Sequence, residues 1–175
     1  MIALPLGTTI ASYRAVTSGS SISRSGQAGR GSPNGLSPRI LVVEDEKQLH
    51  VGLTLLLKRA GYSINCVRSG ADALAVILAS LRLGKSFDLL LLDINMSEMS
   101  GLELMDELDR NGIQLARLVM TGLTDDETLE ALRRRGCRRI LSKPLSPDIV
   151  MREVAAAIAA GKTARRSPPG GTTAA

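Results

Sequence analysis

Short apolar runs alternate along the chain with longer segments whose apolar residues recur every three or four positions. Apolar runs of this length are typical of strands that other elements cover on both faces. The third run contains four consecutive leucines and leads directly into Asp93, so we predict it to be the central strand. Strands are predicted at 39–43, 62–67, 87–92, 115–120 and 138–141.

The intervening segments have the spacing of amphipathic helices. In the first segment Leu49, Leu53 and Leu57 recur every four residues, and Gly61 follows where a helix C-terminal cap is expected. Helices are predicted to begin at Glu46, Ser69, Gly101, Thr124 and Ser146.

Local residues give more detail about three of these helices. The second helix is predicted to bury Leu74 and Leu78. Thr124, with Glu127 three residues later, matches the capping-box pattern at the start of the fourth helix. Gly161 is predicted to end the last helix.

Five strand–helix units in alternation imply an α/β fold, in which a parallel sheet with right-handed crossovers carries helices on both faces. We assign this domain to residues 39–160. Residues 1–38 and 161–175 are rich in small and polar residues, and we interpret them as disordered tails.

Composition and charge change this picture mainly at the tails. Aromatic residues make up 2% of the chain, so the core is predicted to be aliphatic. The net charge is +5, but six of the 22 basic residues lie in the tails and no acidic residue does, so 16 basic residues face 17 acidic ones in the domain. Such dispersed charges contact nucleic acid or anionic lipid only nonspecifically, and we interpret the tails as solvated.

The cysteine and hydropathy patterns restrict the function further. Cys66, Cys137 and the single histidine, His50, do not have the spacing of a zinc site. No apolar run approaches the roughly 18 residues of a membrane span, and the N-terminus lacks the basic start of a signal peptide. We therefore expect a reduced, cytoplasmic protein.

Chemically reactive side chains follow four of the predicted strands. Because the carboxyl ends of parallel strands meet at one edge of the sheet, we expect these side chains to converge on Asp93. Crowded carboxylates repel one another unless a cation neutralises them, and oxygen ligands without a nearby His or Cys suit Mg²⁺. A carboxylate beside Mg²⁺ can act as a nucleophile and form an aspartyl phosphate. The residues are Glu44 and Asp45 after the first strand, Asp93 after the third, Thr121 after the fourth and Lys143 after the fifth.

Each of these residues also has an ordinary structural explanation. An aspartate at a strand end commonly caps a turn or a helix, a lone lysine is usually solvated, and threonine is a frequent strand residue. The whole set in this order would rarely coincide by chance. In that set Lys143 and Thr121 would supply the cation and the hydroxyl donor that a phosphoryl group needs.

The predicted domain, 39–160, resembles the receiver domain of bacterial response regulators of the chemotaxis type. The resemblance implies a doubly wound, flavodoxin-like (βα)5 fold with strand order 2-1-3-4-5. It also leads us to expect a stand-alone receiver domain without an output domain. The matching segments are ILVVEDE (40–46), LLLLDINMSEMSGLEL (89–104), VMTG (119–122) and LSKPL (141–145).

The resemblance implies that the chain is a phosphorylation-dependent switch in a two-component phosphorelay and not a turnover enzyme. Asp93 would accept a phosphoryl group from a histidine kinase or a phosphotransfer protein. Asp45, Asp93 and the backbone carbonyl of Asn95 would ligate Mg²⁺, and Glu44 would help to hold the ion through water.

The resemblance also implies roles on the other side of the acceptor. Thr121 would hydrogen-bond the phosphoryl group and shift on activation, and Lys143 would pair with it. The Lys143–Pro144 bond is expected to be cis, as in the family. The second and fifth strands lie on opposite edges of the family's sheet, so a Cys66–Cys137 disulfide is not expected.

Three residues bear on the alternatives. Ser97 stands where the family usually has proline, and Ile140 where it usually has an aromatic residue that swings inward as the threonine moves. Both departures favour a phosphorylation-independent interaction scaffold, which the complete set of site residues opposes. A Mg²⁺-dependent hydrolase would need a second acid at position 95, where this chain has Asn95.

Output is expected through a protein partner, with a homodimer as a further possibility and no direct contact with DNA or membrane. The family often uses the face formed by its fourth helix, fifth strand and fifth helix. Five arginines surround the end of the predicted fourth helix, more than the dipole of one helix requires. Arg134 and Arg138 are the docking residues we predict on that face.

Overall fold

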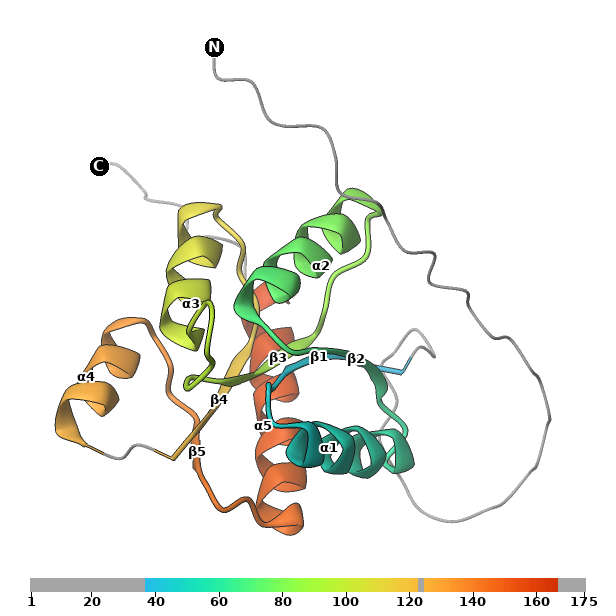
Figure 1. The fold of residues 1–175 in the computed structure, drawn as a ribbon. Helices are drawn as coiled ribbons and strands as arrows, with labels where there is room; N and C mark the ends of the chain where they lie inside the picture. Colours follow the sequence, from blue (N-terminus) through green and yellow to red (C-terminus); the bar gives the residue numbers. More distant parts are fainter. Residues whose placement is uncertain (1–36, 123–124, 167–175) are drawn as a thin grey trace, which may run out of the picture.

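Five parallel strands form the centre of the structure, with helices on both faces of the sheet (Figure 1). The computed structural model describes residues 37–122 and 125–166. Neighbouring strands pair in parallel in the order β2-β1-β3-β4-β5, which confirms the α/β fold class and the flavodoxin-like strand order. The strands are β1 (Arg39–Val43), β2 (Ser63–Val67), β3 (Leu89–Asp93), β4 (Arg117–Thr121) and β5 (Ile140–Ser142).

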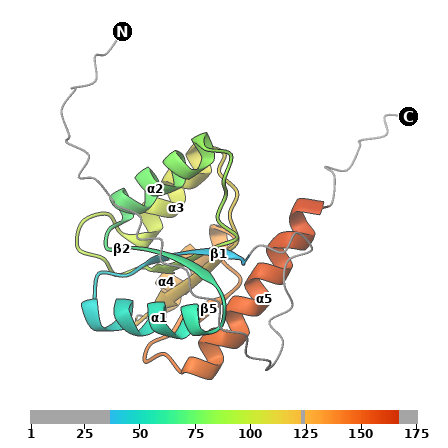
Figure 2. The same cartoon turned by 90° about the vertical axis from the view of Figure 1, so that its right-hand side faces the viewer.

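Two layers of helices cover the sheet. α1 and α5 pack on one face and α2, α3 and α4 on the other, and Figure 2 shows α1 on the opposite side of the strands from α2 and α3. No helix in the described part of the chain is long and apolar enough to cross a membrane. The helices are α1 (Lys47–Arg59), α2 (Gly70–Arg82), α3 (Gly101–Arg110), α4 (Asp126–Arg134) and α5 (Pro147–Arg166).

The alternation of side chains along each strand divides the core between these layers. In β1, Leu41 and Val43 belong to the core under α2, α3 and α4, whereas Ile40 and Val42 belong to the core under α1 and α5. The four leucines at 89–92 have no exposed surface, as expected of the middle strand. Full burial of one such side chain contributes about 1.5–3 kcal/mol to folding, so this run firmly anchors the strand that ends at Asp93.

Several predicted helix ends are confirmed. Ser69 is the N-cap of α2, where its side chain accepts a hydrogen bond from the backbone N–H of Asp72 at 3.1 Å. Gly61 follows α1 with φ at +88°, a left-handed conformation that glycine adopts without steric cost.

The cis peptide bond expected between Lys143 and Pro144 is also present.

α2 buries a different face from the predicted one. Ala73, Ile77 and Ser80 lie in the core, while Leu74 and Leu78 are only half-buried. The helix is apolar around most of its circumference, so the spacing of its leucines did not define a single buried face. Ser80 is satisfied in the interior because its hydroxyl donates to the carbonyl oxygen of Lys85 at 2.7 Å.

The predicted capping box at the start of α4 is wrong. The N-cap is Asp125, whose Oδ1 accepts a hydrogen bond from the backbone N–H of Thr128 at 2.8 Å. Thr124 itself lies outside the described residues. Aspartate caps a helix about as well as threonine does, so the sequence offered two adjacent starts of similar quality.

The predicted end of α5 at Gly161 is also wrong, because the helix continues to Arg166. A Cβ atom added at Gly161 would lie 2.9 Å from the Cβ of Ala116, just before β4. The glycine therefore allows close packing of the helix and does not end it. Residues 161–166, which we assigned to the C-terminal tail, are helical, and residues 1–36 and 167–175 of the predicted tails lie outside the described residues.

Candidate functional site

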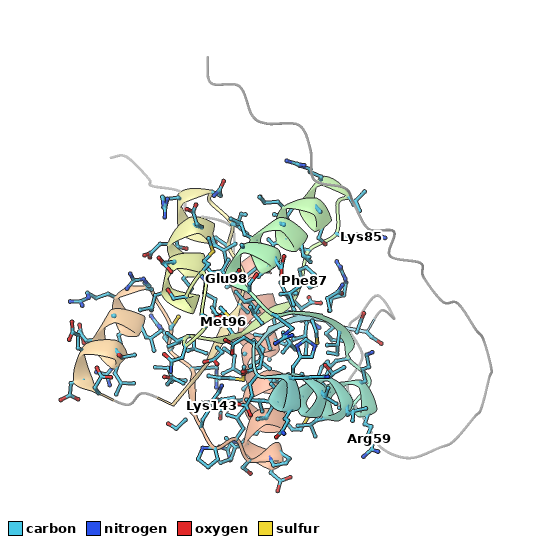
Figure 3. The ribbon with its side chains drawn as sticks, viewed as in Figure 1. Arg59, Lys85, Phe87, Met96, Glu98 and Lys143 are labelled. Carbon is cyan, nitrogen blue, oxygen red and sulfur yellow. The ribbon has the colours of Figure 1, made fainter. Side chains whose placement is uncertain are left out.

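Polar residues from four strand ends meet at the carboxyl edge of the sheet. Asp93 and Thr121 are the last residues of β3 and β4. Glu44 directly follows β1, and Lys143, labelled in Figure 3, follows β5. Because β1, β3, β4 and β5 are consecutive in the sheet, these four ends are neighbours, as the sequence predicted.

Lys143 joins two of these ends through its ammonium group. Its Nζ donates to Oδ2 of Asp93 at 2.7 Å and to Oε2 and Oε1 of Glu44 at 3.1 and 3.3 Å. The side chain of Glu44 is 0% exposed, that of Asp93 3% and that of Lys143 22%. Charges buried to this extent attract one another more strongly than surface pairs, but their desolvation is costly.

The electrostatics of Glu44 reflect this burial. Burial raises the pKa of the Glu44 carboxyl, and the neighbouring charge of Asp93 raises it further, while the hydrogen bond from Lys143 opposes the shift. The carboxyl thus releases its proton less readily than an exposed glutamate does. Crowding of two buried acids against a single lysine leaves the site short of positive charge.

The pKa of Lys143 shifts in the opposite sense from that of an isolated buried lysine. Burial lowers the pKa, but hydrogen bonds to Asp93 and Glu44 together outweigh it, so that the net shift is upward. Lys143 therefore stays protonated at neutral pH and keeps its three donors available to oxygen acceptors.

A third acid completes a cluster that fits a hard divalent cation. One carboxylate oxygen from each of Glu44, Asp45 and Asp93 lies within 4.8 Å of the others. Asp45 is only partly buried, so the cluster is open to solvent on its side. A cluster composed of oxygen donors, without His or Cys among them, matches the ligands that Mg²⁺ prefers.

Backbone groups hold the reactive side chains in place. Oδ1 of Asp93 accepts a hydrogen bond from the backbone N–H of Asn95 at 3.1 Å, which leaves Oδ2 to Lys143. Oε1 of Glu44 accepts from the N–H of Glu46 at 3.2 Å. The N–H of Lys143 donates to the carbonyl oxygen of Thr121 at 2.8 Å and so fixes the loop after β5 to the end of β4.

Gly101 is a site-supporting residue whose role the sequence did not predict. Its N–H donates to the carbonyl oxygen of Ile94 at 3.1 Å. A Cβ added there would lie 2.5 Å from the carbonyl oxygen of Asp93 and 2.9 Å from the Cα of Ile94. Only glycine therefore lets the start of α3 pack directly against the end of β3.

Two more supporting contacts were not predicted from the sequence. Arg68, after β2, donates to the carbonyl oxygen of Asp45 at 2.9 Å. Nδ1 of His50 lies 3.3 Å from the carbonyl oxygen of Glu44. Their partners depend on the pairing of β1 with β2 and on the position of α1, and no local sequence signal indicates either one.

The other predicted residues take the following places. Thr121 is fully buried at the end of β4, and Asn95 is exposed in the loop after Asp93. Ser97 is exposed in the same loop, and Met96 and Glu98 beside it are labelled in Figure 3. Ile140 is half-buried and packs against the core under α2, α3 and α4. The roles assigned to these residues stay predictions.

A model of the response regulator receiver domain family matches residues 40–155, which is more than half of the chain. The chain therefore belongs to the family of response regulator receiver domains. Receiver domains of this family generally bind Mg²⁺ at an acidic pocket, and Glu44, Asp45 and Asp93 form an acidic cluster at the corresponding edge of this sheet. Cys66 and Cys137 are free thiols; Cys66 lies in β2 and Cys137 just before β5, and these strands are the opposite edges of the sheet.

Curated relatives are longer than this chain. It is 34% identical over 108 residues to a response regulator receiver protein of Anaeromyxobacter sp. (strain Fw109-5), a match that covers 62% of this chain and 43% of the relative. It is 33% identical over 120 residues to the transcriptional regulatory protein ZraR of Salmonella typhimurium strain LT2, covering 69% of this chain and 26% of ZraR. The chain thus spans less than half the length of these relatives.

Solved structures give the same fold. The signal receiver domain of a protein described as a Luxo repressor, from Vibrio parahaemolyticus, has a TM-score of 0.67 and 28% identity, covering 74% of this chain and 96% of that one. A CheY-like response regulator receiver domain protein from Methanospirillum hungatei JF-1 has a TM-score of 0.65 at 20% identity, covering 74% of this chain and 99% of that one. At that identity the second likeness concerns the fold alone.

Proposed function

We propose that this chain is a phosphorylation-dependent switch in two-component signalling and that Asp93 is its phosphoacceptor. The observation that carries the proposal is the buried contact between Lys143 and Asp93, with Nζ 2.7 Å from Oδ2. Membership of the receiver family supports the reaction class. The donor would be a histidine kinase or a phosphotransfer protein.

The proposed reaction is one phosphoryl transfer. An oxygen of Asp93 attacks the phosphorus of a donor phosphohistidine, a P–O bond forms, the P–N bond breaks, and the donor imidazole keeps the electron pair. Lys143, already held between Glu44 and Asp93, is placed to pair with the added oxygens. Thr121, at the end of β4, would donate its hydroxyl to the same group.

The acidic cluster is the proposed Mg²⁺ site. Asp45, Asp93 and the backbone carbonyl of Asn95 would hold the ion, with Glu44 assisting through water. When bound, Mg²⁺ would supply the positive charge that neutralises the phosphoryl oxygens. Burial of Glu44 and its proximity to Asp93 support the proposal, because among the described residues only Lys143 forms an ion pair with these two carboxylates.

The chain would promote only its own phosphorylation and the later hydrolysis of the aspartyl phosphate. We therefore propose that it is not a turnover enzyme acting on a released substrate. We also propose a cytoplasmic location, which the free thiols of Cys66 and Cys137 support.

The test is the mass of the intact protein after incubation with acetyl phosphate and Mg²⁺. We expect one added phosphate in the wild type, and none in Asp93→Asn or in the presence of EDTA. Equal phosphate in the wild type and in Asp93→Asn would place the acceptor elsewhere. No added phosphate from acetyl phosphate or from a panel of kinases would instead favour a scaffold that works without phosphorylation.

Output would pass to a protein partner through the face formed by α4, β5 and α5, with a second copy of the chain as a further partner. The ion pairs of this region explain why Arg134 and Arg138 are the proposed docking residues. Arg135 pairs with Asp106, and Arg139 pairs with Glu153. Within the described part of the chain, neither Arg134 nor Arg138 has an ion-pair partner. We propose no direct contact with DNA or membrane. Charge reversal at Arg134 and Arg138 together is expected to weaken partner binding or self-association, and unchanged binding of both kinds would contradict this face.

A further inference from the structure

A groove lies at the end of the sheet opposite to Asp93, where β4 and β5 begin. Its volume is about 1030 Å³. Arg117, the first residue of β4, and Ile140, the first of β5, both line it. The second half of α5 and the segments that follow α3 and α4 form its other sides. None of the predicted phosphoacceptor or Mg²⁺-site residues lines this groove, whereas Arg138, predicted as a docking residue, does.

The charges of the groove are mostly positive. Four arginines line it, together with two acids, Asp109 and Glu153. Both acids are already paired with lining arginines, Asp109 with Arg117 and Glu153 with Arg139. The lining arginines are Arg117, Arg135, Arg138 and Arg139.

The two remaining arginines differ in their pairing. Arg135 pairs with Asp106, which does not line the groove, through bonds of 2.7 and 2.9 Å. Arg138 is exposed and has no ion-pair partner in the ranges 37–122 and 125–166. The groove thus presents an unneutralised cation at its rim, and the neighbouring acids are held by other arginines.

The long side of the groove is made of small residues. Ala157, Ala160, Gly161 and Ala164 of α5 line it, opposite Ala116. Ala164 belongs to this side because α5 continues past Gly161. Small side chains expose little apolar surface but let a ligand backbone approach closely, so the lining suits an extended chain better than a bulky ring system.

We propose that this groove is a docking site for an extended, acidic segment of a partner protein. Its volume is at the upper end of the roughly 300–1,000 Å³ of small-molecule pockets, so it can hold several residues of a peptide. The proposal rests on the proposed function in that the chain acts through a protein partner, and it names the chemistry of a partner segment beside Arg138, which the groove shares with the proposed output face.

Other occupants fit the lining less well. A single-stranded nucleic acid would find no aromatic side chain on which its bases could stack, because none is among the residues that line the groove. The chain's own residues 1–36 and 167–175 contain no acid at all, so they lack the complementary charge. Charge complementarity therefore favours an acidic partner segment.

The test uses the full chain and a fluorescein-labelled peptide of alternating glutamate and alanine, followed by fluorescence anisotropy at low salt. A peptide with lysine in place of glutamate and a labelled oligothymidylate serve as comparison probes. Two pairs of variants separate the groove from general charge. Arg138→Glu and Ala160→Glu alter the groove, whereas Arg133→Glu and Ala159→Glu make the same changes at exposed positions outside it.

We expect saturable binding of the acidic peptide, weakened about fivefold or more by each groove variant and by less than about twofold by each matched control. If a groove variant and its matched control weaken peptide binding equally, or if the wild type shows no saturable binding, the proposal is overturned. Tighter binding of the oligothymidylate than of the acidic peptide would also overturn it, in favour of nucleic acid. The assay is repeated with Asp93→Asn, which should bind the peptide as the wild type does. Binding in this variant does not depend on phosphorylation, so the result for the groove can be judged separately from the phosphoacceptor proposal.

Discussion

The two ends of the parallel sheet hold their charges in different ways. At the carboxyl end Glu44 and Asp93 are buried with a single lysine between them. At the amino end, pairs such as Arg135–Asp106 are part-exposed, with side chains 27% and 41% exposed. Buried charges interact strongly and are costly to leave unpaired, whereas exposed pairs contribute little to stability.

This contrast fits the proposed division between a reactive end of the sheet and an end that a partner would contact. The carboxyl end concentrates uncompensated negative charge where a cation and a phosphoryl group could relieve it. The amino end keeps its ion pairs partly in solvent, where they contribute less to folding, although the side chain of Arg117 is only 11% exposed.

The largest effect is expected from Lys143→Met. Removal of the ammonium group leaves Glu44 and Asp93 buried without a cation, and in EDTA the free energy of unfolding should fall by about 3 kcal/mol. Urea unfolding followed by circular dichroism measures the change. Lys85→Met, at an exposed lysine labelled in Figure 3, serves as the control and should change stability very little. Equal changes in the free energy of unfolding of the two variants would show that the contacts of Lys143 contribute no more to stability than an exposed lysine does.

Gly101→Ala should have the next largest effect. The added methyl would meet the backbone of Asp93 and Ile94, so we expect a loss of about 2 kcal/mol and slower phosphorylation by acetyl phosphate. Gly52→Ala in α1 is the matched control, because a Cβ there has no atom within 4 Å. That variant should gain about 0.5–1 kcal/mol from better helix formation. Normal stability and phosphorylation in Gly101→Ala would contradict the proposed close packing.

Glu44 should make stability fall as the pH rises. Its pKa in the folded state lies above the ordinary value of 4.5, because burial and the charge of Asp93 raise it. The folded state then holds this proton more tightly than the unfolded state does, so ionisation of Glu44 costs stability above pH 4.5.

The measurement is urea unfolding of the wild type and Glu44→Gln in EDTA, from pH 4.5 to about pH 7.5. As the pH rises across this range, the free energy of unfolding of the variant should increase relative to that of the wild type. This change is expected whatever the difference between the two proteins at the lowest pH. Parallel pH profiles would mean that Glu44 titrates normally and that the carboxyl end is not short of positive charge.

The smallest effect is expected at the amino end. Arg135→Met removes both hydrogen bonds to Asp106, but this pair is part-exposed, so the loss should be only about 0.5–1 kcal/mol. Arg133→Met is the control, since its nearest acid, Glu130, is 3.9 Å away and both side chains are exposed. A loss at Arg135 as large as that at Lys143 would remove the distinction between the two ends.

The sequence predicted the carboxyl end well because its chemistry requires particular residues at strand ends. The convergence of Asp93 with the polar residues at the carboxyl ends of β1, β4 and β5 follows directly from strand spacing and the geometry of parallel sheets. Gly101, Arg68 and His50 were missed because their contacts exist only after the strands and helices have packed. The amino-end groove was missed for the same reason.

The errors in helix boundaries have a common physical origin. Local sequence indicates which residues can cap a helix or lie on its buried face, but tertiary packing determines which of them do so. Asp125 and Thr124 were both adequate N-caps, and α2 had no polar face to exclude Leu74 from the core. Gly161 has the residue type of a helix end, yet its contact with Ala116 makes it a packing position inside α5.

The most direct test of the account is the position of the phosphate on the chain. The protein would be phosphorylated with acetyl phosphate and Mg²⁺ and reduced with sodium borohydride, which converts an aspartyl phosphate to homoserine, and then mapped by peptide mass. We predict homoserine at position 93 and at no other acid of the cluster. Homoserine at position 45, or an unreduced Asp93 in protein that carries phosphate, would contradict the assignment of Asp93 as the phosphoacceptor.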